Sequence, residues 1–370
     1  MEPTQPLPGQ QPGAPSGLIL DGQPTTALTP TQLAQIAKEA RLLPPILGQI
    51  VEYLVTDPVG FTLTTAELIT AASQINSLQK AFQPLDLVRE QPDYARIALA
   101  MVTDTAASTQ VAQLLGVRQG LAMSGMHARA VLGYLTRWPA FAATLTGTGP
   151  DRFGVPVRIV ARIDSAYGDA CYLDGELLLK AFSLLHPYGY LRLFLHEAGH
   201  ATFERSLLAG AVLPPEVATA AAAEIGRCVE LVAQLARSGP VGNQTAELAS
   251  LQLRLPNGAA TVAAIKAMSP DARSLYGAWL VLRRNGGQYL LGLDLGPSMS
   301  PAERRRYQAG DFGEFCAESF MQAATTELAE YVRGLQPAAA GTPPEVLTAW
   351  TTAVQILLAY RKRIVGAQVR

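Results

Sequence analysis

Two histidines four residues apart, with a glutamate between them, form the pattern with the clearest chemical meaning in this chain. Residues 196–200 read HEAGH and have the spacing H-E-x-x-H. On a helix, residues four apart lie on one face, so the imidazoles of His196 and His200 can bind one zinc ion. In such a site the glutamate beside the first histidine accepts a proton from zinc-bound water, and we expect Glu197 to be this general base.

A catalytic zinc site also needs a third protein ligand and an open coordination position. The third histidine of the longer metzincin pattern is missing, because Ser206 stands at its position. No histidine follows His200, so the third ligand must be a carboxylate. Glu204 lies one turn beyond His200 and is better placed to hydrogen-bond an imidazole than to bind the metal. The remaining candidates lie on later predicted helices: Glu224, Glu230, Glu314 and Glu318.

Two motifs of this chain together resemble a known family of zinc peptidases. HEAGH, followed downstream by Tyr307 and then by EFCAESF at residues 314–320, is similar to the gluzincin family of the anthrax lethal factor catalytic domain and the Pro-Pro endopeptidases. The resemblance implies that Glu314 is the third zinc ligand and Glu318 a residue that supports a ligand. It also implies that Tyr307 donates a hydrogen bond to the transition state. Glu224 stays the alternative third ligand.

The elements that must hold these residues follow from hydrophobic periodicity and turn residues. Residues 155–163 alternate apolar and polar side chains, and residues 170–180 form a second predicted strand. This second strand is the expected sheet edge, to which a substrate peptide would add in extended form. A helix beginning near Tyr190 carries HEAGH, and another from Asp311 to Val332 carries Glu314. Asp311 and Glu314 also fit the spacing of a helix start, so the glutamate could instead serve in capping.

Three regions are predicted along the chain. Residues 1–27 are rich in Pro, Gln and Gly and indicate a flexible tail. Residues 28–145 form a helical N-terminal domain, in which Thr64 and Glu67 have capping-box spacing. Residues 150–370 form a zincin-like metallopeptidase domain with a helical insertion at about 210–300. The predicted fold is therefore mainly α with a small β-sheet (α+β), in which the zincin-like domain follows an all-helical domain.

The low charge of the chain excludes several classes of partner. Charged residues make up 16% of the chain and the net charge at pH 7 is −1. A nucleic-acid-binding protein usually carries a basic excess, so we expect no nucleic acid partner. No run of about 18 residues is both apolar and uncharged, so we expect no membrane insertion. The N-terminus has no signal-peptide pattern, which indicates a cytoplasmic location by default, or export without a cleavable signal.

The function expected from these patterns is that of a zinc-dependent endopeptidase. Its cofactor would be Zn²⁺ and its substrate a protein or peptide bound as an extended strand. The alternative is a non-catalytic helical binding or scaffold protein with a structural or vestigial zinc site. The helical N-terminal domain is, in addition, a candidate surface for a protein partner.

Overall fold

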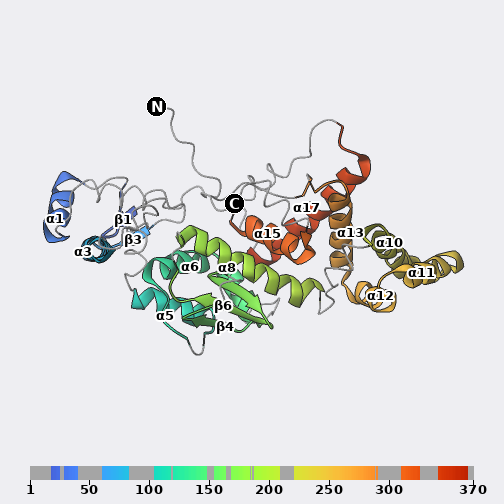
Figure 1. Ribbon diagram of the computed structural model, residues 1–370, viewed down its shortest axis with the longest axis horizontal. Coiled ribbons are helices and arrows are strands. Elements are labelled where there is room, and N and C mark those ends of the chain that lie inside the picture. Colours follow the sequence, from blue (N-terminus) through green and yellow to red (C-terminus); the bar gives the residue numbers. More distant parts are fainter. Residues whose placement is uncertain are drawn as a thin grey trace. The chain divides into compact units, whose positions relative to one another are not determined.

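The computed structural model describes the chain in two compact units (Figure 1). The described residues are 18–25, 29–40, 61–82, 104–117, 120–147, 154–163, 168–183, 185, 187–208, 221–287, 289–290, 310–325 and 341–365. The first unit comprises Met1–Phe194 and the second Leu195–Arg370, so their boundary falls inside helix α8 (Pro187–Thr202). Most described residues are helical and the sheets are small, which confirms the predicted mainly α class with a small β-sheet. The predicted domain limits stay predictions.

The first sheet of unit 1 corrects two expectations. Its strands are β1 (Leu18–Leu20), β2 (Gln23–Thr25) and β3 (Phe61–Leu63), in the order β2-β1-β3. Part of the expected flexible tail is therefore a hairpin, and the expected all-helical domain contains a strand. The cause of the hairpin is local, because Asp21 and Gly22 both have positive φ, at 49° and 80°. An Asp-Gly pair with this conformation makes the two-residue turn that matches the twist of flanking strands.

The helices of unit 1 carry the predicted helix start and a half-buried ion cluster. They are α1 (Pro30–Ala40), α3 (Thr65–Phe82), α5 (Thr105–Leu114), α6 (Gly125–Arg137) and α7 (Pro139–Thr146). The capping box is confirmed, because the backbone N–H of Thr64 donates to Glu67 at 2.8 Å and that of Glu67 donates to Thr64 at 3.2 Å. Arg129 donates to Glu67 at 3.0 Å and to Asp104 at 2.9 Å. This single guanidinium therefore joins α3 and α6 to the start of α5.

The second sheet of unit 1 contains the predicted strands, with one correction. Its strands are β4 (Val157–Val160), β5 (Ala170–Leu173) and β6 (Glu176–Lys180), in the order β4-β6-β5. The single strand expected over residues 170–180 is a hairpin, because Asp174 and Gly175 have φ of 51° and 80° and reverse the chain. β6 is therefore central, parallel to β4 and antiparallel to β5. Within the described residues β5 pairs with β6 alone, so β5 has the unpaired edge.

The first half of α8 is fixed to this sheet and to α6. The hydroxyl of Tyr190 donates to the carbonyl of Lys180 at 2.8 Å. The ring of His127 lies 4.6 Å from the ring of Tyr190, and its Nε2–H donates to the carbonyl of Leu185 at 2.8 Å. Burial lowers the pKa of His127 to about 4. These contacts hold the part of α8 that precedes the HEAGH motif.

Unit 2 is helical throughout its described residues. After α8, a π-helical turn, η4 (Phe203–Leu208), ends the HEAGH helix. The other helices are α10 (Ala222–Ser238), α11 (Gly242–Arg254), α12 (Gly258–Ala267), α13 (Pro270–Arg284), α15 (Phe312–Thr325) and α17 (Pro344–Val365). Helix α13 packs against α10 and α17, and α17 also packs against α15. Among the described helices, none combines the length and the apolar character needed to cross a lipid bilayer.

Candidate metal centre

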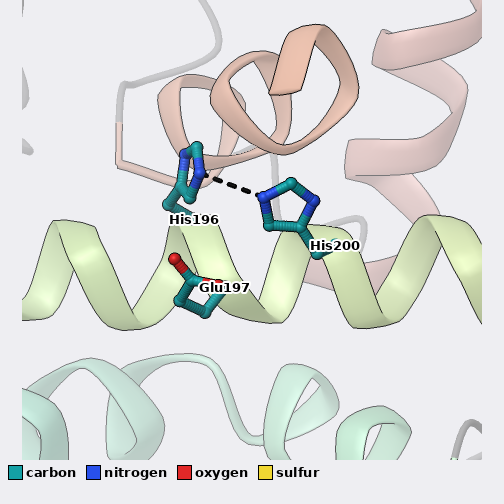
Figure 2. Close-up of side chains that lie close together, drawn as sticks. All are labelled: His196, Glu197 and His200. Atoms are coloured by element: carbon teal, nitrogen blue, oxygen red, sulfur yellow. Dashed lines mark hydrogen bonds between the residues drawn. The ribbon is translucent and has the colours of Figure 1, made fainter. Parts of the chain in front are cut away.

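Helix α8 presents the two histidines of the motif on one face. His196 is buried and His200 is half-buried. Figure 2 shows their rings facing each other above the helix, with Nε2 of His200 3.2 Å from Nε2 of His196. This arrangement follows from the four-residue spacing, since one helical turn places the second ring beside the first.

A close crossing of α8 and α15 brings the second motif to these histidines. A Cβ at Gly199 would lie 2.9 Å from Ala317 Cα and 3.0 Å from the Ala317 carbonyl oxygen. It would also lie 3.1 Å from the ring of Phe320. The two backbones are therefore in contact at a point where α8 has no room for a side chain larger than that of glycine. Gly199 and Ala317 thus determine which residues of α15 face the imidazoles.

Helix α15 begins so that Glu314 lies beside both rings. Asp311 caps this helix, because its Oδ1 accepts from the backbone N–H of Gly313 at 2.6 Å and from that of Glu314 at 3.2 Å. The Glu314 carboxylate takes no part in this cap. Its Oε2 lies 3.2 Å from His196 Nε2 and 3.5 Å from His200 Nε2. Glu314 therefore supplies a backbone donor to the cap and a side chain to the histidines.

The tautomer of His196 is set by Glu318, one turn further along α15. Glu318 is buried, and its Oε2 lies 3.1 Å from His196 Nδ1. A carboxylate accepts hydrogen bonds, so Nδ1–H of His196 is the donor in this contact. Nε2 is then the ring nitrogen that faces His200 and Glu314. This is how an outer carboxylate orients a metal-binding imidazole.

The three inward atoms form a triangle with the dimensions of a zinc site. Its edges are 3.2 Å between the two Nε2 atoms, 3.2 Å from His196 Nε2 to Glu314 Oε2, and 3.5 Å from His200 Nε2 to Glu314 Oε2. Tetrahedral ligands about 2.0–2.1 Å from zinc lie about 3.3–3.4 Å from one another. The residues present therefore fit a tetrahedral ion held by two nitrogens and one oxygen.

The electrostatics of the triangle also favour a cation. Burial opposes ionisation of Glu314, but its contacts with His196 and His200 outweigh burial and hold its pKa below its usual range. Glu314 is thus a carboxylate, and it faces Nε2 of both imidazoles. A cation at the centre would interact favourably with this carboxylate and with the electron pairs that deprotonated Nε2 atoms offer a metal.

Glu197 is the third residue of the motif whose side chain lies near the imidazoles. It is half-buried on α8, and Figure 2 shows it below the two rings. One of its carboxylate oxygens and a nitrogen of each histidine lie within 4.8 Å of one another. Glu197 therefore adds a second carboxylate near the histidines, besides that of Glu314, whose Oε2 lies 3.2 and 3.5 Å from the two Nε2 atoms.

The other residues considered from the sequence have different surroundings. Glu224 is half-buried near the start of α10, and Glu230 forms an ion pair with Arg227 at 2.5 Å. Neither is brought to the imidazoles. Glu204 lies in the π-helical turn, and no hydrogen bond joins it to His196 or His200 among the described residues. The expected support of a histidine by Glu204 stays a prediction. Tyr307 lies outside the described residues.

Sequence reasoning missed the residues that hold α15 in place. The ring of Phe312, the first residue of α15, lies 4.8 Å from Tyr276 and 5.6 Å from Trp279. Both partners belong to α13 and are buried. The helical insertion therefore packs against the beginning of the helix that carries Glu314. The only sequence signal was the aromatic pair on α13, which indicates core packing but not its partner.

Comparisons with known proteins leave this site to be interpreted from its own geometry. No protein-family model, no curated protein and no solved structure matches the chain.

Proposed function

We propose that this protein is a zinc-dependent endopeptidase of the gluzincin type with a zincin-like catalytic domain. The observation that supports the proposal is the triangle of His196 Nε2, His200 Nε2 and Glu314 Oε2, with edges of 3.2, 3.2 and 3.5 Å. A structural metal site would close the fourth position with another protein ligand. In the proposed site the fourth position is left to water, and Glu197 is the nearby carboxylate that hydrolysis requires.

The residues of the triangle would hold Zn²⁺, and Glu318 would keep His196 in the tautomer that offers Nε2. When bound, the ion supplies Lewis acidity, which polarises a carbonyl group and makes water more acidic. Two neutral imidazoles and one carboxylate leave a net positive charge on the loaded site. That charge suits the oxyanion that develops when a peptide bond is attacked.

Glu197 performs the proton transfers of the proposed reaction. Its carboxylate takes a proton from the attacking water as the new C–O bond forms at the scissile carbonyl. It then gives this proton to the amide nitrogen as the C–N bond breaks, so that a carboxylic acid and an amine leave. Tyr307 is the proposed additional donor to the oxyanion. The substrate is proposed to be a protein or peptide that binds in extended form.

Three substitutions separate this function from the alternatives. Glu197→Gln keeps the size of the side chain and removes the base, so zinc should stay bound at one equivalent while peptide cleavage falls by about 10⁴-fold or more. Glu314→Ala should lose both zinc and cleavage. Glu224→Ala is the matched control and should change neither.

The assay measures bound zinc by elemental analysis and cleavage with a diverse peptide library read by mass spectrometry. Zinc retained by Glu314→Ala and lost by Glu224→Ala would overturn the ligand assignment. One equivalent of zinc without cleavage of any library member, in a wild-type protein whose spectroscopy with Co²⁺ shows four protein ligands, would favour the scaffold alternative.

A further inference from the structure

A groove on unit 2 lies apart from the metal-binding triangle. It runs between α10 and α13, which pack side by side (Figure 1), and encloses about 490 Å³. Small residues make up part of its lining, which we call the floor: Ala222, Gly226 and Ala233 of α10 and Gly277 of α13. The lining also contains the larger Val229, Leu280 and Val281. A Cβ at Gly226 would meet nothing within 4 Å, so the groove is open at its floor. Small residues in such a position allow the backbone of another helix to approach closely.

The margins of this groove are basic. Four arginines line it, Arg227, Arg237, Arg273 and Arg284, against a single carboxylate, Glu230. Arg227 is neutralised by its ion pairs with Glu230 at 2.5 Å and with Glu247 at 2.6 Å. Among the described residues, no ion pair joins a carboxylate to the other three; Arg273 also donates to the backbone carbonyls of Lys266 at 3.2 Å and Met268 at 2.9 Å. Residues 221–287 carry seven basic and four acidic side chains, a net charge of +3, whereas the whole chain has −1. The positive charge is thus concentrated on this helical segment.

The spacing of these charges indicates the shape of the ligand. Arg273 and Arg284 are eleven residues apart on α13, which is about 16 Å at 1.5 Å per residue. A compact anion such as phosphate cannot contact both ends of that span. A helix whose acidic residues are also eleven apart presents them on one face at the same separation, because eleven residues make slightly more than three whole turns.

We propose that the groove between α10 and α13 binds an acidic amphipathic helix of a partner protein. The small floor receives the apolar or Ala-rich face of that helix. The guanidinium groups of Arg273 and Arg284 pair with carboxylates near its two ends, and Arg237 provides a further cationic contact. This binding activity is separate from the proposed hydrolysis and requires neither Glu197 nor the metal.

The probe for this surface is a fluorescently labelled Ala-rich peptide of about 18 residues, long enough to be helical, with two glutamates eleven residues apart. Binding to the full chain is followed by fluorescence anisotropy at low salt. Two control peptides have the same length: one has lysines for the glutamates, and one has its glutamates nine residues apart, on opposite faces of the helix. We expect the eleven-residue peptide to bind at least tenfold more tightly than either control.

Variants of the chain test the location of binding. Arg284→Glu should weaken binding of the probe at least tenfold, and Arg162→Glu, an exposed arginine of unit 1, should leave it unchanged. Gly226→Leu fills the groove while improving helix propensity, so it should weaken binding without destabilising the fold. Circular dichroism checks that each variant is folded.

Several results would overturn the proposal. They are the absence of probe binding, equal binding of the three peptides, and equal loss of binding in Arg284→Glu and Arg162→Glu. Tighter binding of a single-stranded oligonucleotide to the same groove would assign the surface to nucleic acid instead. Concentration-dependent dimerisation that Arg284→Glu abolishes would assign it to a second copy of this chain.

Discussion

Because Gly199 contacts Ala317, adding one methyl group in Gly199→Ala should lower the metal affinity of the proposed site. In Gly199→Ala the new Cβ would lie 2.9 Å from Ala317 Cα, whereas ordinary contacts begin at 3.4 Å. The backbones must then separate by about 0.5 Å, because neither contact atom belongs to a flexible side chain. The same displacement lengthens the bond from His196 Nδ1 to Glu318 from 3.1 Å to about 3.6 Å, beyond hydrogen-bond range. Loss of such an outer partner typically lowers metal affinity about 10–100-fold.

The stability change in this variant should be smaller than the change in affinity. Overpacking costs about 1–3 kcal/mol, and replacing a helical glycine by alanine returns about 1 kcal/mol. Gly226→Ala is the matched control, since it has the same propensity gain and its Cβ meets nothing within 4 Å. The assay is competition for zinc with a chelator, beside urea denaturation of the metal-free proteins. A zinc affinity in folded Gly199→Ala within twofold of both wild type and Gly226→Ala would refute the reasoning.

Two further predictions concern the packing around α15 and the buried histidine of unit 1. Phe312→Ala should lower zinc affinity and reduce the free energy of unfolding by about 1–3 kcal/mol, because the half-buried ring holds the start of α15 on α13. Phe312→Leu should have a zinc affinity and a free energy of unfolding closer to those of wild type, as measured by chelator competition and urea denaturation. His127 is neutral when folded, with a pKa of about 4 instead of 6.5. Stability should therefore fall by up to about 3 kcal/mol as the pH drops from 6.5 to 4, and urea titrations in a metal chelator should show a smaller fall in His127→Gln. Identical pH profiles of the two proteins would contradict this role for His127.

The histidine pair could be predicted from sequence because its geometry is local. A helix needs only the spacing of His196 and His200 to bring two rings together, and the apolar residues before them indicate the helix. Glu318 lies 122 residues from His196, so its contact depends on packing. That packing rests on Gly199 and Ala317, and nothing distinguishes these from the many other small residues of this chain. Only the resemblance to a known family connected the two motifs.

The hairpins were missed for a different physical reason. β5 has four residues and β6 has five. Strands this short have too few alternating apolar and polar side chains to show where one strand ends and the next begins. The reversal depends on the Asp174–Gly175 pair, which was visible but lay inside what read as one apolar run. The Asp21–Gly22 turn was hidden in the same way by a segment rich in proline and glutamine. The turn signal was therefore more informative in both places than the composition around it.

A donor set of two imidazole nitrogens and one carboxylate oxygen has consequences for which metal the proposed site would bind. The affinity of such donors for divalent first-row metals rises toward Cu²⁺, which binds more tightly than Zn²⁺. The triangle of His196, His200 and Glu314 therefore cannot reject copper or nickel by its donor atoms alone. The ion found in the protein reflects the metals present while it is synthesised and purified. After nickel-affinity chromatography, the measured metal content would include nickel taken up from the column. The protein should therefore be produced in a medium of defined zinc content and purified without a metal column.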